Sequence, residues 1–319
     1  MKAKLTVLFL FAAAFCGLTL ARPAHAEEKK KILFLAGGPS HGYAEHEHLA
    51  GCLLLSKRLN ESGLPVESSV VQGWPADPHA FDGVAAIVIY CDGGGGHLIM
   101  KHIPQFNELV KKGVGVGCIH YAVEVPKGDG GDALLKAIGG YFEVRWSINP
   151  TWTAHFTEFP KHPTANGVKP FTTQDEWYYH MRFQSDMAGV TPLLTTVPPD
   201  STRGGKDDDH GGNPEVRSGI GKNLQEHVVW VYQRPDNGGR GFGCTGAHYH
   251  RNWSQDDFRK AILNSIVWIA GLEVPADGVA SKRPDADELL QNIPESKKKS
   301  PKFDMAAELK KVEALNAPK

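Results

Sequence analysis

A stretch of ten residues, Pro39–His48, carries three histidines and two glutamates directly after an apolar segment. The apolar segment, Ile32–Ala36, predicts a buried parallel strand, and Gly37 and Gly38 predict the turn that ends it. Open α/β sheets bind their ligands just past the carboxyl ends of the strands. Histidine and glutamate side chains can bind metal ions or transfer protons. Their position directly after the predicted strand therefore indicates a ligand-binding or catalytic site.

Two more apolar segments are followed by residues of the same kind. Asp92 and His97 come after Val84–Tyr90, and His120 comes after Val114–Ile119. The carboxyl ends of neighbouring parallel strands lie at one edge of a sheet, so these side chains should meet around one cleft. We expect His120 and Asp92 to take part in catalysis and His97 to contact the substrate.

His120 stands where a sharp turn between strand and helix is predicted. In the segment Gly115–Ala122, small residues lie two positions before and two positions after it, as in a nucleophile elbow. Cys118 falls two residues earlier, inside the strand, and should point into the sheet. An exposed imidazole at this turn predicts a metal ligand or a general acid–base group, while an ordinary hydrogen-bonded histidine is the alternative.

An acidic and aromatic run, Asp175–His180, stands in the second half of the chain and is followed by Arg182. Carboxylates beside aromatic rings suit sugars, because rings stack on C–H surfaces while carboxylates bind hydroxyls or move protons. Glu176 is therefore a candidate catalytic group, and with Asp92 it could form the carboxylate pair of a glycosidase. The alternative is that the aromatic residues of the run pack an edge strand. The side chains expected to bind substrate are His97, Trp152, Trp177, Tyr178 and Arg182.

Three histidines at predicted strand ends form a candidate metal site. His41 and His120 follow the strands already named, and His248 follows the predicted strand Gly241–Thr245. Three imidazoles, with a carboxylate nearby and a bound water, suit zinc or a similar divalent ion, which would act as a Lewis acid. The sequence has no compact zinc motif such as HExxH, so metal-free acid–base chemistry, with no cofactor, is the alternative.

The elements that would position these residues follow from the apolar patterning. Strands and helices alternate over residues 31–140, which predicts a mainly parallel sheet with helices on both faces. The predicted strands there are 32–36, 66–71, 84–91 and 114–119, and the predicted helices are 45–60, 103–112 and 132–138. Later strands are predicted at 142–146, 152–158, 190–197, 228–232 and 241–245, with a helix at 255–270. Residues 201–221 predict a long polar surface loop, either an insertion or a lid.

The bulk properties limit the class of protein. Residues 1–26 predict a signal peptide, 27–275 one domain and 276–319 a polar tail outside the core, so a periplasmic or secreted protein is expected. A formal net charge of −1 without a basic stripe argues against nucleic acid as a partner, and no membrane span is predicted. Beyond Cys16 the cysteines are expected to be small buried residues, with one or two disulfides left open.

Several segments together resemble the ThuA-like (trehalose utilisation) family, in particular its secreted branch. They are GGPSHGYAEHEH, GCIHYAVE, Trp146–Trp152, Gln174–Tyr179 and GGRGFGCTGAHYHRNW, the last running into FRKAILNSIVWIAG. The resemblance implies a flavodoxin-like, class I glutamine amidotransferase-like three-layer sandwich with a mainly parallel sheet. It also implies a link to the catabolism of trehalose and related sugars, including 3-keto-sugars. Because His120 occupies the turn where amidotransferases have a cysteine, glutaminase activity is not expected.

The leading hypothesis is a secreted enzyme that processes a small-molecule carbohydrate, either a glycoside or a keto-sugar. It would use His/Glu acid–base or metal-assisted chemistry, as a hydrolase, lyase or isomerase. One alternative is a sugar-binding module without catalysis, and another is an amidohydrolase that uses Cys118. The sequence gives no prediction of the oligomeric state.

Overall fold

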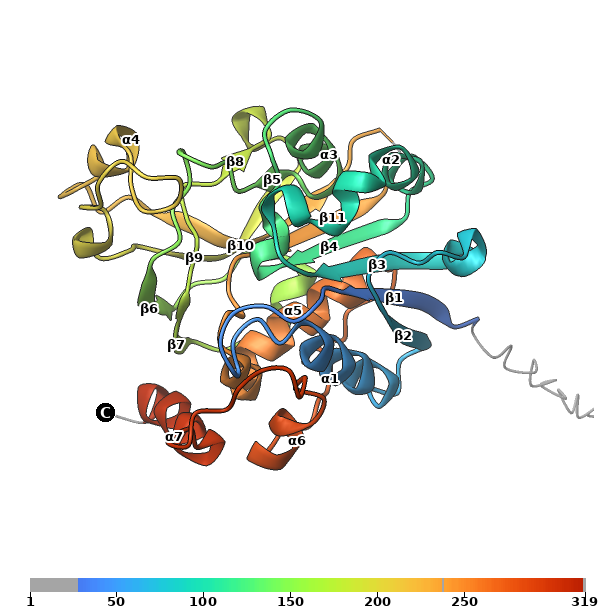
Figure 1. Ribbon diagram of the computed structural model, residues 1–319. Coiled ribbons are helices and arrows are strands. Elements are labelled where there is room, and N and C mark those ends of the chain that lie inside the picture. Colours follow the sequence, from blue (N-terminus) through green and yellow to red (C-terminus); the bar gives the residue numbers. More distant parts are fainter. Residues whose placement is uncertain (1–27, 237, 318–319) are drawn as a thin grey trace, which may run out of the picture.

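A seven-stranded sheet with the order β2-β1-β3-β4-β11-β10-β9 forms the centre of the protein (Figure 1). The computed structural model describes residues 28–236 and 238–317. Strands β1 to β4 and β11 are parallel, whereas β10 is antiparallel to both β11 and β9. The strands of this sheet are β1 (Lys30–Ala36), β2 (Val66–Gln72), β3 (Val84–Tyr90), β4 (Gly115–Ile119), β9 (Val190–Thr196), β10 (Glu226–Gln233) and β11 (Arg240–Cys244).

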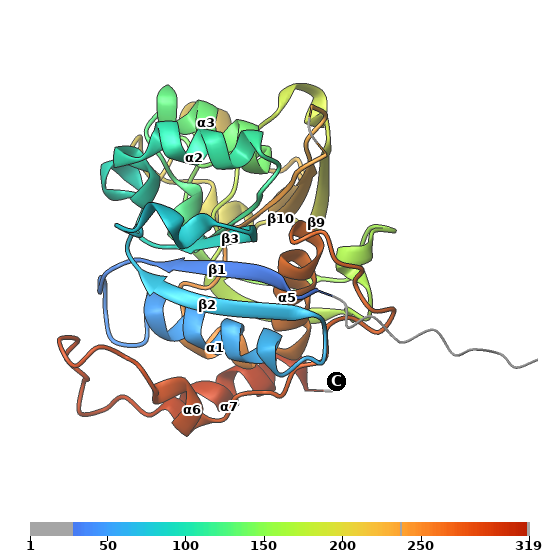
Figure 2. The same ribbon diagram turned by 90° about the vertical axis from the view of Figure 1, so that its right-hand side faces the viewer.

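Helices cover both faces of this sheet, with α2 and α3 on one face and α1 and α5 on the other (Figures 1 and 2). Side chains of β1 alternate between the two cores: Ile32 and Phe34 pack on the α1 and α5 side, Leu33 and Leu35 on the α2 and α3 side. The predicted α/β fold with a mainly parallel sheet is therefore confirmed. The helices are α1 (His48–Asn60), α2 (Ile103–Lys111), α3 (Asp129–Ile138), α4 (Pro214–Arg217), α5 (Asp256–Ile269), α6 (Ala286–Leu290) and α7 (Met305–Asn316).

Two small antiparallel sheets follow α3. They pair β5 (Gly140–Tyr141) with β8 (Arg182–Phe183), and β6 (Thr151–Phe156) with β7 (Phe171–Glu176). The predicted strand at 142–146 is wrong. The carbonyl oxygen of Glu143 accepts hydrogen bonds from the N–H groups of Trp146 and Ser147, which closes a turn instead of extending a strand.

The C-terminal segment packs on the domain through α6 and α7. Leu289 and Met305 are buried and belong to the core formed with α1 and α5, and Val312, two turns after Met305 on the same face of α7, is also buried. The prediction that residues 276–319 lie outside the core is therefore wrong. A few widely spaced apolar residues in this polar segment are enough to pack it against the rest of the domain.

The predicted signal peptide, residues 1–26, lies outside the described residues. No helix within 28–236 or 238–317 is both long and apolar enough to cross a bilayer. A periplasmic or secreted location stays a prediction.

Candidate functional site

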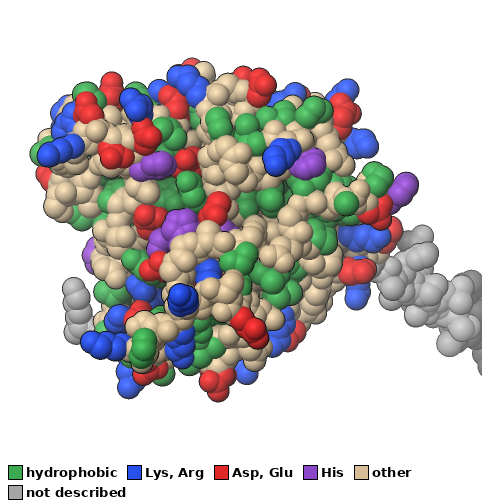
Figure 3. Space-filling model, viewed as in Figure 1, with side chains coloured by type: hydrophobic (Ala, Val, Ile, Leu, Met, Phe, Trp, Pro, Cys, Tyr) green, Lys and Arg blue, Asp and Glu red, His purple; other side chains and the backbone are tan. Residues whose placement is uncertain are grey.

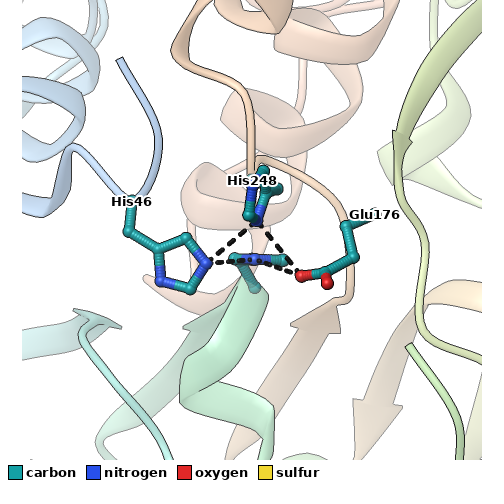
Figure 4. Close-up of side chains that lie close together, drawn as sticks. His46, Glu176 and His248 are labelled. Atoms are coloured by element: carbon teal, nitrogen blue, oxygen red, sulfur yellow. Dashed lines mark hydrogen bonds and ion pairs between the residues drawn. The ribbon is translucent and has the colours of Figure 1, made fainter. Parts of the chain in front are cut away.

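Three histidines and a glutamate meet at the carboxyl edge of the sheet, and Figure 3 shows histidine side chains gathered in a hollow of this face. His46, His120, Glu176 and His248 each offer one ligand atom, and these atoms lie within 4.8 Å of one another (Figure 4). His46 Nε2 is 3.0 Å from His248 Nδ1 and 3.0 Å from His120 Nε2. Glu176 Oε2 is 3.1 Å from His248 Nδ1 and 3.5 Å from His120 Nε2. We call these four residues the His/Glu cluster.

Distant parts of the chain supply the cluster. His46 lies in the loop between β1 and α1, His120 directly follows β4, His248 follows β11, and Glu176 is the last residue of β7. His46 and His120 have positive φ angles of 46° and 56°. Such backbone conformations cost a non-glycine residue about 1–3 kcal/mol and persist only where the surrounding structure imposes them. The sharp turn predicted at His120 is present.

The second ring nitrogen of two of these histidines has its own partner. His120 Nδ1 lies 2.7 Å from the Thr245 carbonyl oxygen, which can only accept, so this nitrogen carries the proton. His46 Nδ1 lies 3.2 Å from Asp92 Oδ1 and donates to it. Asp92, predicted to be catalytic, thus orients His46 and does not join the cluster. In the neutral rings the two Nε2 atoms are unprotonated, and their lone pairs face each other across 3.0 Å.

Burial favours the neutral form of two cluster histidines. It lowers the pKa of His46 and of His120, and neighbouring histidines lower both pKa values further. Burial also opposes the charged form of His248, but the hydrogen bond and charge of Glu176 outweigh it and raise the pKa of His248. Converging imidazole nitrogens beside a carboxylate are a ligand set that could hold a divalent cation.

A lysine of the C-terminal segment fixes the loop that carries His46. Lys297 Nζ donates to the carbonyl oxygens of Glu45 and His46 and lies 3.2 Å from Glu47 Oε1. The same Glu47 oxygen accepts from the Ala44 N–H at 2.8 Å. The Lys297 and Glu47 side chains are both buried, so the loop and the C-terminal segment share one buried ion pair. The sequence does not indicate this role, because Lys297 stands in a run of three lysines, a pattern typical of a solvated surface.

Asp175 anchors the turn that carries His248. Its carboxylate accepts hydrogen bonds from the N–H groups of Ala247, His248 and Tyr249 at 2.6, 3.0 and 3.3 Å. The side chain is fully buried. Strand β7 therefore supplies Glu176 to the cluster and, one residue earlier, the group that positions His248.

One family model matches the chain over residues 32–269, a range that includes the whole His/Glu cluster, and its description is trehalose utilisation. The chain belongs to the ThuA family. No curated protein matches the chain at a significant level.

Solved structures of two bacterial ThuA-like proteins share this fold. The protein from Bacteroides uniformis is 17% identical, with a TM-score of 0.53 over 78% of this chain and 94% of its own. The protein from Parabacteroides merdae is 15% identical, with a TM-score of 0.50 over 80% of this chain and 98% of its own. A glutamine amidotransferase from Thermotoga maritima aligns at 10% identity with a TM-score of 0.38, over 76% of this chain and 96% of its own. At these identities the ThuA-like structures show the fold alone.

Two of the three predicted metal ligands, His120 and His248, lie in the cluster beside Glu176. The third, His41, does not. Its side chain is 40% exposed, and its ring stacks on that of His46 with 3.6 Å between the centroids. His46, whose side chain is 1% exposed, takes its place.

Three of the predicted substrate-binding residues serve the core instead. His97, Trp152 and Trp177 are all buried. His97 Nε2 donates to the Ala122 carbonyl and its Nδ1 accepts from the Ile99 N–H, so neither ring nitrogen is left for a substrate. The indole N–H of Trp152 donates to the carbonyl of Trp177. The structure corrects the prediction for all three.

The other two predicted substrate contacts differ from each other. The Tyr178 hydroxyl lies 3.2 Å from His120 Nε2, which places this tyrosine at the cluster. Arg182 is not part of the cluster: its guanidinium lies 3.4 Å from the centroid of the Trp146 ring and bonds to Glu143 at 3.0 Å. Of the run Asp175–His180, Glu176 and Tyr178 thus lie at the cluster, whereas Trp177 belongs to the core.

The thiols of the described residues are free and buried. Burial raises the pKa of the Cys118 thiol well above its usual range. A buried, protonated thiol is a poor nucleophile, so the amidohydrolase alternative has no support in this geometry.

A cavity of about 320 Å³ lies beside the loop that carries His46. The four cluster residues do not line it, and its link to them is Glu45, a lining residue whose Oε2 lies 3.8 Å from His248 Nε2. Its lining combines aromatic rings with hydrogen-bonding groups, as in Tyr43, Glu45, Gln174, Tyr249, Arg251 and Phe303. The volume suits a small ligand.

The long loop of residues 201–221 also reaches the neighbourhood of the cluster. His210 Nε2 lies 3.0 Å from a carboxylate oxygen of Glu124, and its carbonyl accepts from the Asn149 N–H at 3.1 Å. The Asn149 side chain donates to Glu176 Oε1 at 3.3 Å. Asn149 therefore links the loop to Glu176 of the cluster. This position is compatible with the predicted alternative that the loop is a lid.

Proposed function

We propose that this protein is a metal-dependent enzyme that acts on a carbohydrate, with a divalent cation held by His46, His120, His248 and Glu176. The observation that carries the proposal is the 3.0 Å separation between the Nε2 atoms of His46 and His120. Both atoms are acceptors in the neutral rings, and two lone pairs this close repel unless a positive charge lies between them. Burial disfavours a proton there, and a metal ion fits the ligand set.

The spacing of the ligand atoms supports a first-row ion. Zinc–nitrogen bonds are about 2.0–2.1 Å long, so neighbouring ligands of tetrahedral zinc lie about 3.3 Å apart. The four distances given above between cluster atoms, from 3.0 to 3.5 Å, bracket that value. Asp92 and the Thr245 carbonyl supply the outer hydrogen bonds that ligating histidines normally make.

The cluster also has groups that can handle protons. A bound cation would polarise a carbonyl or hydroxyl oxygen of the substrate. Glu176 Oε1 accepts from the Asn149 side chain, and this hydrogen bond orients the carboxylate with Oε2 toward the cluster. The Tyr178 hydroxyl, next to His120, is a hydrogen-bond donor at the same place. A glycosidase pair of Asp92 and Glu176 is not part of the proposal, because Asp92 is engaged in holding the His46 ring.

The carbohydrate part of the proposal rests on the family description and on the cavity lined by Glu45, the neighbour of His248. The ring of Tyr43 lines the cavity and offers a surface for the C–H groups of a sugar, and Glu45 offers hydrogen bonds to its hydroxyl groups. The Arg251 guanidinium covers the Tyr249 ring at 4.0 Å and donates to Glu308 and Gln174. A periplasmic or secreted location belongs to the same proposal.

Metal analysis tests the cation site. Protein dialysed against metal-free buffer should retain about one first-row ion per chain. His120→Gln should retain none, with a circular dichroism spectrum like that of the wild type. His79→Gln is the matched control, since His79 is exposed and bonds only to Asp82 and to its own turn. Full retention by the His120→Gln protein would contradict the site.

Turnover is tested with trehalose and its 3-keto derivative, followed by NMR. Product formation should stop after treatment with EDTA and return when zinc or manganese is added. Unchanged turnover after chelation would contradict a role for the metal. Saturable binding without any product would favour the sugar-binding module.

A further inference from the structure

A second group of ligand atoms lies on the other side of the His46 ring, around Asp92. Asp92 Oδ1 accepts from Ser40 Oγ at 2.7 Å and lies 3.2 Å from His46 Nδ1. Two more imidazole nitrogens, His41 Nδ1 and His48 Nε2, each lie 3.7 Å from the same oxygen. Three histidine rings thus surround a single carboxylate oxygen.

His48 shows that this group is incomplete. Its Nδ1 lies 2.9 Å from the Gly38 carbonyl and donates to it, so Nε2 carries a lone pair in the neutral ring. Among the described residues this Nε2 atom has no hydrogen-bond partner, and the side chain is 1% exposed. A buried acceptor without a partner is destabilising, because it has lost its hydrogen bonds to water. The atom faces a second acceptor, Asp92 Oδ1, across a gap of 3.7 Å.

The packing around His48 prevents its ring from turning away. The ring meets that of Tyr90 edge to face, with 4.9 Å between the centroids. On the other side, a side chain at Gly37 would place a Cβ atom 2.9 Å from His48 Nδ1 and 2.7 Å from the Cα atom of Cys91. Gly37 therefore lets the ring sit against the ends of β1 and β3, with Nε2 directed at Asp92.

We propose that Asp92 Oδ1 and His48 Nε2 hold a second cation, separated from the first by the ring of His46, and that the exposed His41 turns toward this ion as a third ligand. Bonds to nitrogen and oxygen ligands of about 2.0–2.2 Å let one ion bind two atoms that are 3.7 Å apart. The side chains of His41 and Asp92 are 40% and 37% exposed, so the third ligand can adjust and the ion keeps open positions toward solvent. Imidazole and carboxylate together select a divalent first-row ion such as Zn²⁺ or Mn²⁺.

This inference deepens the proposed function and rests on it in one respect, since His46 Nε2 is assigned to the first cation. Two ions on opposite sides of one imidazole ring can bind two oxygens of the same substrate. A keto-sugar presents such a pair in its carbonyl and a neighbouring hydroxyl.

Equilibrium dialysis against Mn²⁺, followed by elemental analysis, counts the sites. We expect about two ions per chain in the wild type and in His79→Gln, and about one in each of His48→Gln and His120→Gln. One ion in the wild type would overturn the second site and leave the proposed function intact. No ion at all would overturn both. Two ions in the His48→Gln protein would show that the second ion is adventitious.

A second measurement covers the case in which the buried His48→Gln substitution prevents folding. His41→Gln changes an exposed residue and should raise the Mn²⁺ concentration that half-fills the second site by about tenfold or more. In the wild type, the electron paramagnetic resonance spectrum at two equivalents of Mn²⁺ should show dipolar broadening, because the two ions would be separated only by the imidazole ring of His46. A sharp spectrum of isolated Mn²⁺ at two equivalents would overturn the proposal.

Discussion

Lys297 Nζ lies 3.2 Å from Glu47 Oε1, and both side chains are buried next to the loop that carries His46. Removal of one partner of a buried ion pair leaves an uncompensated charge, at a cost of about 3–5 kcal/mol. The C-terminal segment, which contributes no ligand atom to the His/Glu cluster, thus holds one of its histidines in place.

Replacement of Lys297 by methionine should lower both stability and metal affinity. Lys297→Met keeps the length of the side chain but leaves the Glu47 carboxylate unpaired and the His46 carbonyl without its donor. We expect the free energy of unfolding to fall by about 3 kcal/mol and the affinity for the first cation to fall by about tenfold. Urea titration and competition with a metal indicator measure the two effects. Lys298→Met is the control, since Lys298 is exposed, and an equal loss in both variants would contradict the argument.

Asp175→Asn should weaken the turn that carries His248. An asparagine keeps the size of the side chain but turns one acceptor oxygen into an NH₂ group that faces backbone donors. The free energy of unfolding should fall by about 2–3 kcal/mol, because buried N–H groups lose their partner. Thermal unfolding measures it, with Gln174→Ala at the exposed neighbouring position expected to stay within about 0.5 kcal/mol of the wild type. An unchanged midpoint for Asp175→Asn would rule out the anchoring role.

The Cys118 thiol should be inert in the native protein. Burial raises its pKa, so the reactive thiolate is scarce and reagents cannot reach it. Iodoacetamide should leave Cys118 unmodified until the protein is unfolded in urea, and turnover should survive the native treatment. Peptide mass mapping before and after unfolding measures the modification. Rapid labelling of the native protein at Cys118, with loss of turnover, would restore the amidohydrolase alternative.

The fold could be predicted because its signals are local. A strand that is buried on both faces is apolar at every position, and segments such as Val84–Tyr90 carry that pattern on their own. The turn at His120 could be predicted for the same reason, since the small residues around it lie within a few positions. Once parallel strands are assigned, the shared carboxyl edge follows, and with it the meeting of His120 with His248.

The remaining ligand could not be predicted, because distant contacts select it. Pro39–His48 holds three histidines, and the backbone turns at His41 as well as at His46, so only contacts with the rest of the fold direct the turn at His46 toward the cluster. The ion pair of Glu47 with Lys297 supports that turn, and no local pattern encodes a pair between segments so far apart. Asp175 is a similar case: in the sequence it is one of two adjacent acids, and only the fold buries it.

His97, which is buried in the core and not placed to contact a substrate, should make the stability of the protein depend on pH. Burial lowers the pKa of His97 to about 4, whereas a histidine in an unfolded chain has a pKa of about 6.5. As the pH falls below 6.5 the unfolded chain takes up a proton that the folded protein excludes until about pH 4. Protonation therefore favours unfolding across this window, and the loss of stability from His97 by pH 4 is roughly 3 kcal/mol.

His97→Asn removes this titration while its side-chain oxygen can still accept from the Ile99 N–H. The variant should be less stable than the wild type at pH 7, because the Ala122 carbonyl loses its donor. The difference should shrink as the pH is lowered to 4, since only the wild type loses the contribution of His97. Urea unfolding at pH 7, 5.5 and 4 measures it, and the exposed His79→Asn variant should follow the wild type throughout. Parallel stability curves for wild type and His97→Asn would show that the imidazole is not excluded from protonation in the fold.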